Sequence, residues 1–274
     1  MNHQSLVKPP LVMGIVNVTP DSFSDGGRHA TTELALTHAL RLIDQGADVL
    51  DIGGESTRPG SDPVGEAEEI ARVVPVIAAL RARWDGRISI DTMKPGVARA
   101  AVAAGATMWN DVSALEHAPD SLATVADLGC EVVLMHMKGA PKTMQDAPRY
   151  DDVTGEVVAH LAARAEAAMA AGVAREKIWL DPGIGFAKTT AHNLELTARL
   201  DALVDLGFPV LYAASRKRLI HGVDETAVQA TDRLGGSLAL ALEGARRGAR
   251  MVRVHDVRET VQALKVQAAV AAAG

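Results

Sequence analysis

The sequence is poor in residues on which many classes of site depend. Its 274 residues include one cysteine, and aromatic residues make up 3%. A single cysteine allows neither an internal disulfide nor a cysteine-based zinc site. Cys130 opens the apolar run "CEVVLM", so we expect a small buried residue there and not a reactive thiol. The core must come mainly from Ala, Val, Leu and Ile.

Long apolar runs and an excess of basic charge are also missing. No apolar run approaches the ~20 residues that span a membrane. Residues 1–10 contain no apolar signal region, so we expect a cytoplasmic protein with a loosely ordered amino-terminal segment. The net charge of −6 argues against nucleic acid as a partner. We therefore expect small-molecule partners, without nucleic acid or membrane.

What the chain does contain is an alternation of short β-branched runs and longer Ala- and Leu-rich stretches of helical period. Helix-like stretches include 31–45, 66–83, 152–171 and 226–247. Strand-like runs lie at 11–18, 49–54, 87–92, 107–112, 131–137, 177–182, 209–215 and 250–256. Continuous apolar strands joined by helices form parallel sheets. Eight such units predict an α/β chain with one (β/α)8 TIM barrel over residues 1–274, with a doubly wound open sheet as the alternative.

Almost every predicted strand ends on a polar side chain. In such barrels the catalytic groups lie at the carboxyl ends of the strands and in the loops that follow. Taken singly, an Asp or Asn at such an end could instead cap the next helix, but capping does not explain why nearly all the ends are polar together. The end residues are Asn17, Asp91, Asn110, Asp111, His136, Asp181, Ser215, Arg216, Lys217, Arg253 and His255.

These residues divide into two sets by the chemistry that they can recognise. Acceptors and one amide suit a flat heterocycle with several N–H donors, and this set contains Asp91, Asn110 and Asp181. Cationic donors suit a phosphate or diphosphate, and this set contains Arg58, Lys217, Arg253 and His255. The mouth of the barrel is therefore predicted to bind a nitrogen heterocycle beside a phosphate group.

One tempting motif fails. The stretch "GIGFAKT" (183–189) resembles a phosphate-binding P-loop, but Lys188 comes one residue too early and Ala187 stands where that motif requires Gly. No pair of histidines has zinc-ligand spacing either.

Seven motifs together resemble one known family. "NVTPDSFSDGG", "DIGGESTRPG", "SIDT", "NDVS", "DPGIGF", "SRK" and "RVHDV" stand in the order found in dihydropteroate synthase, and the likeness runs from about residue 11 to 257. The resemblance implies a transferase of folate biosynthesis that joins 7,8-dihydropterin-6-ylmethyl diphosphate to para-aminobenzoate and releases diphosphate. It also implies a Mg²⁺ requirement and a homodimer.

The resemblance implies roles for particular residues. The pterin would be held by Asp91, Asn110, Asp181 and Lys217. The diphosphate would be held by Asn17, Thr57, Arg58, Arg253 and His255, with Asn17 also a Mg²⁺ ligand. The para-aminobenzoate would lie against Phe23, Phe186 and Arg218. Catalysis would rest on Asn17, Lys217 and Asp25, whose carboxylate would stabilise positive charge on the pterin while Phe23 excludes water.

Two positions depart from the family pattern. Ala187 replaces a glycine, which is expected only to stiffen the turn, and Arg218 replaces a serine expected to contact the aminobenzoate carboxylate. Arg218 either reaches the same carboxylate as a charged donor or turns to solvent. Dissociative and in-line displacement both remain open, as do a methyltetrahydrofolate-dependent methyltransferase and a non-catalytic pterin-binding barrel as alternative functions.

Overall fold

The computed structural model describes residues 9–19, 27–56, 62–139 and 148–273, so most of the expected amino-terminal segment 1–10 lies outside them. Eight parallel strands form one sheet in the order β6-β5-β4-β3-β2-β1-β8-β7. They are β1 (Leu11–Asn17), β2 (Val49–Gly53), β3 (Arg87–Asp91), β4 (Met108–Asp111), β5 (Glu131–Met135), β6 (Ile178–Asp181), β7 (Leu211–Tyr212) and β8 (Met251–Val254). A parallel bridge between Leu180 and Val210 joins the two ends of that order. The predicted TIM barrel is thus confirmed, and the open doubly wound sheet is excluded.

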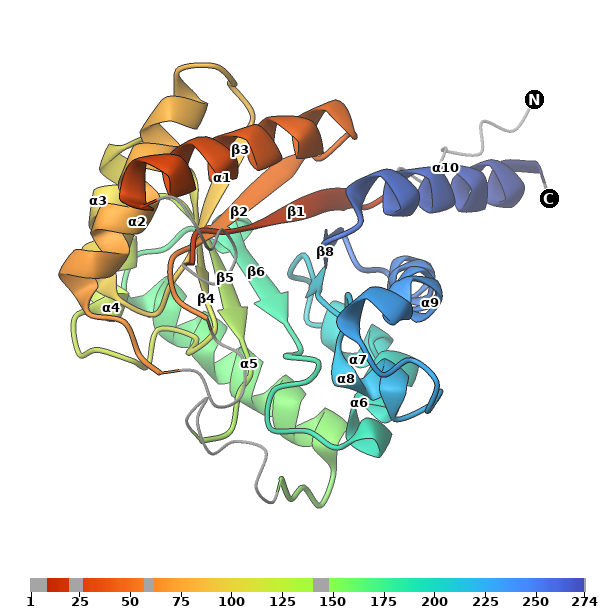
Figure 1. Cartoon of the computed structure of the whole chain (residues 1–274). Helices are drawn as coiled ribbons and strands as arrows, with labels where there is room; N and C mark the ends of the chain where they lie inside the picture. Colours follow the sequence, from red (N-terminus) through yellow and green to blue (C-terminus); the bar gives the residue numbers. More distant parts are fainter. Residues whose placement is uncertain (1–8, 20–26, 57–61, 140–147, 274) are drawn as a thin grey trace, which may run out of the picture.

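Helices surround the strands, and α1, α2 and α3 lie side by side along one flank of the barrel (Figure 1). Their bounds are α1 (Gly27–Asp44), α2 (Glu66–Arg81), α3 (Pro95–Ala103), α4 (Ser121–Leu128), α5 (Val153–Ala170), α6 (Thr190–Ala198), α7 (Asp201–Val204), α8 (Arg218–His221), α9 (Leu234–Arg246) and α10 (Val257–Ala273), with 3-10 turns η2 (Arg175–Lys177) and η3 (Ala230–Arg233). None of the helices in these described ranges is long and apolar enough to cross a membrane.

Two helices begin one turn or more away from the expected residue. The helix expected over 31–45 begins one turn earlier, at Gly27. The helix expected over 226–247 was wrong at its start, because residues 226–229 are not helical and η3 precedes α9. Asp224 accepts hydrogen bonds from the main chain and side chain of Thr226, which holds that segment as a turn instead.

The inside of the barrel is layered because side chains alternate between the two faces of a strand. A small buried cluster fills its lower part: Met13, Val49, Met108, Val133, Trp179, Leu211 and Met251. Two residues further along four of these strands stand Asp51, Asn110, Asp181 and Arg253, in the same inward phase. The apolar layer therefore gives way to a polar one toward the carboxyl ends of the strands.

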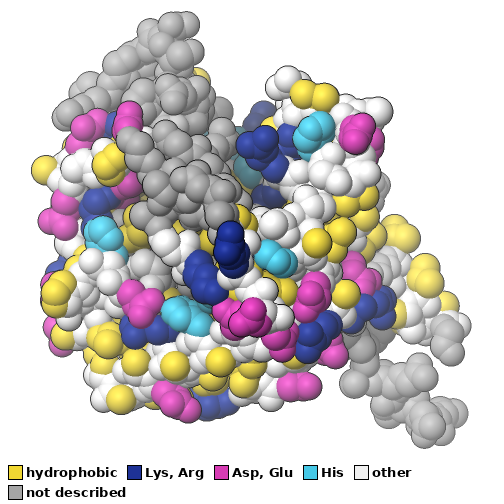
Figure 2. Space-filling model, turned by 90° about the horizontal axis from the view of Figure 1, so that it is seen from below, with side chains coloured by type: hydrophobic (Ala, Val, Ile, Leu, Met, Phe, Trp, Pro, Cys, Tyr) yellow, Lys and Arg dark blue, Asp and Glu magenta, His cyan; other side chains and the backbone are white. Residues whose placement is uncertain are grey.

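The opposite face of each strand packs against the helices in one large apolar core that includes Leu50, Ile52, Ile90, Leu134 and Leu180. Cys130 is buried in this core as expected. Burial raises the pKa of its thiol to about 11, which favours the unreactive protonated form. On the face drawn in Figure 2, Lys and Arg side chains lie interspersed with Asp and Glu, so the described part of that face does not gather charge of one sign.

Candidate active site

Strand register brings the first predicted residues together. Asn17 pairs with Gly53, Gly53 with Asp91, and Asp91 with Asn110, so one row crosses the ends of β1 to β4. A Cβ placed on Gly53 would lie 3.8 Å from both Asn17 Oδ1 and Asp91 Oδ2. Those two oxygens therefore border the same space above Gly53, which the missing side chain leaves open.

Arg253 links Asp91 of this row to Asp51, which lies two residues before Gly53 on β2. Its Nε donates to Asp51 Oδ2 at 2.6 Å and its Nη2 donates to Asp91 Oδ2 at 2.7 Å. Asn110 Nδ2 donates to the same Asp51 oxygen at 3.1 Å. The second oxygens, Asp51 Oδ1 and Asp91 Oδ1, are buried and have no hydrogen-bond partner among the described residues. They are therefore acceptors available to a ligand.

The electrostatics of this cluster follow from its burial. Desolvation raises the pKa of Asp91 to about 7, with Arg253 opposing the rise and Asp51 adding to it. Burial by itself would lower the pKa of Arg253, but the charges of Asp51 and Asp91 raise it above its usual value. The guanidinium thus stays charged, and Asp91 can exchange a proton near neutral pH.

Lys217 lies against the turn that follows β6. Its Nζ donates to Ile184 O and lies 4.7 Å from the centroid of the Phe186 ring. Gly185 permits this approach, since a Cβ there would lie 3.0 Å from Lys217 Cδ. Burial lowers the pKa of Lys217 to about 8, with the charge of Asp181 opposing the drop. A cationic donor and an aromatic face are thereby held together.

Asp181 stands at the start of the same turn and is buried at 3% exposure. Its Oδ1 accepts from the Gly183 main-chain N–H at 2.7 Å. Burial raises its pKa, and the charge of Lys217 opposes the rise. The carboxylate has one oxygen in the turn and sits close enough to Lys217 for the two charges to interact.

The ends of β7 and β8 contribute His255. Its Nδ1 lies 3.0 Å from Ser215 Oγ, and its main-chain N–H donates to the same hydroxyl at 3.2 Å. Arg216 does not belong to this group, because its side chain turns to Asp256, with Nε donating to Oδ2 at 2.9 Å. Arg218 is exposed at the first position of α8.

The structure accordingly brings together, around the strand ends, eight predicted residues: Asn17, Asp91, Asn110, Asp181, Lys217, Arg253, His255 and Phe186. Four others lie outside the described residues: Phe23, Asp25, Thr57 and Arg58. Helix capping does not account for the acidic strand ends, because the N-cap of α3 is Lys94 and that of α6 is Thr189.

Asp51 is the residue that the strand-end analysis missed. It lies two residues before the end of β2, is fully buried, and supports both Arg253 and Asn110. The signal was available in the sequence, since a charged residue inside the apolar run "VLDIG" needs a buried partner. Asp51 was missed because it lies inside the strand and not at its end.

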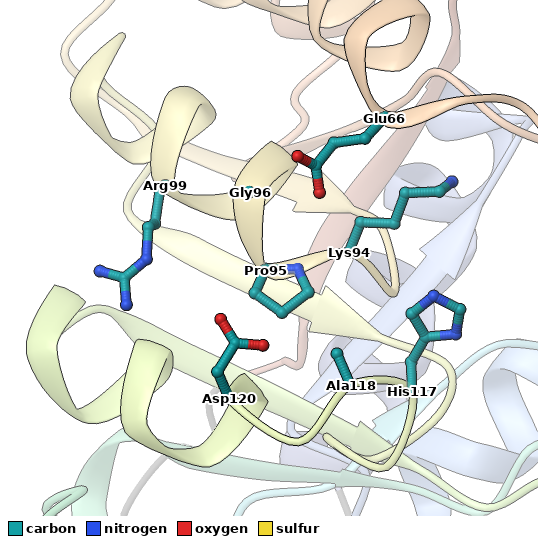
Figure 3. Close-up of a pocket in the computed structure, with 8 residues that line it drawn as sticks. All are labelled: Glu66, Lys94, Pro95, Gly96, Arg99, His117, Ala118 and Asp120. Atoms are coloured by element: carbon teal, nitrogen blue, oxygen red, sulfur yellow. The ribbon is translucent and has the colours of Figure 1, made fainter.

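A separate hollow of about 390 Å³ lies beside the strand ends, at the first turn of α3 (Figure 3). It contains none of the expected site residues; its lining is Glu66, Lys94, Pro95, Gly96, Arg99, His117, Ala118 and Asp120. The Lys94 amine points out of this hollow in Figure 3 and donates to Glu69 Oε2 at 2.6 Å and to Glu55. The amine of Lys94 therefore binds carboxylates near the end of β2 and does not bind a group among the described residues of the hollow.

Comparison with known proteins decides the family. The sequence profile of the pterin-binding enzymes matches residues 13–255. The dihydropteroate synthase of Escherichia coli strain K12 is 48% identical over 257 residues, which is 94% of this chain and 90% of that protein. This chain belongs to the dihydropteroate synthase family.

Solved structures agree with this membership. The dihydropteroate synthase of Xanthomonas albilineans with 4-aminobenzoic acid is 53% identical and has a TM-score of 0.91, over 97% of this chain and 94% of that one. The same enzyme in complex with 7,8-dihydropteroate is 50% identical with a TM-score of 0.87, over 97% and 95%. Dihydropteroate synthases are transferases, and their barrel is the fold described above.

Proposed function

We propose that this chain joins 7,8-dihydropterin-6-ylmethyl diphosphate to para-aminobenzoate, giving 7,8-dihydropteroate and diphosphate. The observation that carries the proposal is the meeting of two opposite kinds of group at one end of the barrel. Buried acceptors with free oxygens lie there beside the cations Lys217 and Arg253. Together they suit the donor-rich edge of a pterin and the charge of its diphosphate.

The pterin would lie across Asp91, Asn110 and Asp181. The unpartnered Asp91 Oδ1 can accept from a ring N–H or amino group, and Asp51 Oδ1 offers a second such acceptor below it. The Lys217 ammonium, which keeps most of its protons at neutral pH, would donate to the ring carbonyl. These groups would recognise the pterin and orient its methylene carbon without forming a bond to it.

The diphosphate would be held on the opposite side of the strand row. Arg253 uses Nε and Nη2 on the two aspartates, which leaves Nη1 to donate to a phosphate oxygen. His255, Asn17 and, from the second loop, Thr57 and Arg58 would add donors. As the carbon–oxygen bond to the leaving group weakens, Asp25 of the first loop would stabilise the positive charge that spreads into the pterin.

Magnesium would be bound at Asn17. Asn17 Oδ1 borders the open space above Gly53, and an amide oxygen of this kind suits Mg²⁺. No group of three His, Cys, Asp or Glu side chains in the described residues is arranged to hold a metal. Mg²⁺ often takes one or two protein oxygens and completes its shell with water and substrate phosphate, so this donor set fits it. When bound, it supplies charge that stabilises the departing diphosphate.

The para-aminobenzoate ring would lie against Phe186, whose ring is already held beside Lys217 Nζ. Phe23 of the first loop would close the other side. Arg218 is exposed at the start of α8, immediately after Lys217, and from there its guanidinium could meet the benzoate carboxylate or remain in solvent. The chain would form a homodimer, with α9 and α10 as its contact surface.

The test measures diphosphate release from the dihydropterin diphosphate, with and without para-aminobenzoate and Mg²⁺. Release that needs Mg²⁺ and yields dihydropteroate is the expected result. Asp181→Asn should weaken pterin binding by about 10- to 100-fold, because a charged, buried acceptor is lost. The matched control is Asp127→Asn, whose carboxylate is 69% exposed and pairs only with Arg99 among the described residues. Tight pterin binding without release would instead favour the methyltransferase or non-catalytic alternative.

A further inference from the structure

Lys188 is a buried lysine for which the proposed reaction has no use. It is 3% exposed, and it follows the 182–187 turn that connects β6 to α6. Its Nζ lies 3.1 Å from Gly183 O, 3.0 Å from Phe186 O and 3.3 Å from His136 O. One nitrogen thus joins both ends of the turn to the end of β5.

His136 completes the surroundings of this amine. Its Nδ1 lies 3.0 Å from Lys188 Nζ. Burial, then the charge of Lys188, lowers the pKa of His136 to about 3, so the imidazole is neutral. Since an ammonium has no acceptor, Nδ1 is the acceptor in its contact with the charged Lys188. The ring is held edge-on by His160, with 5.0 Å between the ring centroids. Every atom that Nζ meets is therefore an acceptor, on the buried Gly183 and His136 or on the half-buried Phe186.

The turn itself has little regular hydrogen bonding to define it. Gly183, Gly185 and Ala187 have φ of 69°, 82° and 50°, so every second residue is left-handed. Such a chain path forms neither helix nor strand, and for Ala187 it is also strained. Side chains supply the missing contacts: Asp181 Oδ1 accepts from Gly183 N at 2.7 Å, and Asn193 Oδ1 accepts from Gly185 N at 2.7 Å.

The same turn forms the seat of Lys217. Ile184 supplies the carbonyl that accepts from Lys217 Nζ, Gly185 lies under its aliphatic stem, and the Phe186 ring flanks its Nζ. A small rotation of the peptides at 183–186 would therefore move the lysine that is to bind the pterin and the ring that is to line the aminobenzoate pocket.

We propose that Lys188 is a positioning residue, whose amine holds the carbonyls of Gly183, Phe186 and His136 so that the 182–187 turn seats Lys217 and Phe186 for both substrates. Lys188 does not touch either substrate. The inference rests on the proposed function only for the catalytic purpose of the turn; the brace itself stands on the contacts of Lys188.

The test variant is Lys188→Met, which keeps the length of the side chain and removes the donor. The control is Lys177→Met, because Lys177 also donates to a main-chain carbonyl, that of Gly129, but lies just before β6 at the other end of the barrel. Amide hydrogen exchange of 183–187, steady-state turnover, and binding of the dihydropterin diphosphate are measured for both.

In Lys188→Met we expect at least tenfold faster exchange at the Gly185 and Phe186 amides and at least a tenfold loss of turnover, with neither change in Lys177→Met. If Lys188 acts through Lys217, Lys188→Met should weaken pterin binding little further in a Lys217→Met background. A purely structural effect would add to that of Lys217→Met instead, and that result overturns the proposal. Turnover within twofold of the wild type, or unchanged exchange in the turn, also overturns it.

Should Lys188→Met fail to fold, Lys188→Gln, which is shorter but keeps an amide donor, is measured in its place. Lys188→Gln should show the faster exchange in the turn that is expected of Lys188→Met, with a smaller loss of turnover. Turnover equal to the wild type, together with unchanged exchange, contradicts the proposal. If the wild type itself releases no diphosphate, the proposed function fails, while the exchange comparison still decides whether Lys188 holds the turn.

Discussion

Single residues control how the site responds to pH, and Lys217 is the first of them. Burial lowers its pKa to about 8, so the ammonium is lost as the pH rises through that value. We expect kcat/KM for the dihydropterin diphosphate to fall by about tenfold per pH unit above pH 8, since kcat/KM follows ionisation of the free enzyme. A profile that stays flat to pH 9.5 would remove Lys217 as the ionising donor.

Asp91 should make the free energy of unfolding depend on pH. Its native pKa of about 7 lies above the ordinary value of 3.8, so the native state keeps a proton that the unfolded chain has lost. Stability from this group is full at low pH and is lost as the pH rises toward 7. Asp91→Asn removes the effect, and the fall in the urea-derived free energy of unfolding between pH 5 and pH 8 should shrink by about 2 kcal/mol. An unchanged difference between the two pH values would contradict the raised pKa.

At this scale the sequence allowed much of the site to be predicted. Polar residues at strand ends identified Asn17, Asp91, Asn110 and Asp181, because a parallel barrel gathers those ends at one face. It did not identify Asp51, whose partner Arg253 is 202 residues away along the chain. The charge inside "VLDIG" indicates that Asp51 needs a buried partner, but barrel closure decides which residue that partner is, and no local pattern encodes this pairing.

Among the elements, the 182–187 turn depends most on backbone geometry. A Cβ on Gly183 would lie 1.9 Å from His136 O, at a φ of 69° that side chains rarely adopt. We expect Gly183→Ala to lower the free energy of unfolding by about 3 kcal/mol or more, from the overlap and the left-handed strain together. Urea denaturation is the measurement.

The matched control is Gly235→Ala in α9, where a Cβ would meet nothing within 4 Å. A helical position gains up to about 1 kcal/mol from that change. Equal effects of the two substitutions would show that the contact with His136 O does not restrict Gly183.

Element ends also show where sequence reasoning stops. Asp111 was grouped with the strand-end residues, yet it lies out of phase with Asn110 and its carboxylate turns to the following loop. It accepts from the main-chain N–H of Ser113 at 2.7 Å and of Leu115 at 2.9 Å. Leu115 and Ala114 have φ of 65° and 51°. Ala and Leu give no sequence signal for the left-handed region, which favours Gly, Asn and Asp, so this loop could not be foreseen.

For the whole molecule, the fold was predictable because eight apolar runs alternate with helices and no linker interrupts them. The assembly is a further expectation. Gln267 of α10 donates to Leu242 O of α9 at 2.9 Å, so the two helices form one surface. On α10, Val266 and Val270 are 59% and 68% exposed, and residues four apart share a helix face.

We expect the wild type to sediment as a dimer and the double variant Val266→Asp with Val270→Asp as a monomer, by analytical ultracentrifugation. Two charges on an apolar contact surface oppose its burial. Val223→Asp is the control, at a valine that is 65% exposed but lies after α8. A wild type that is monomeric, or a double variant that stays dimeric, would exclude this face as the contact.

The shortness of β7 has a consequence for motion. Between β6 and β7 the barrel is joined by the single bridge of Leu180 with Val210 and by Leu180 N donating to Pro209 O at 3.0 Å. That seam is the place where the sheet has least to hold it shut, and thermal opening should begin there. Asp181 ends β6 on one side of this junction and Lys217 follows β7 on the other, so a pterin bound to both would hold the two strands together. Substrate binding would then stabilise the closed barrel, and activity would change in parallel with the population of that closed state.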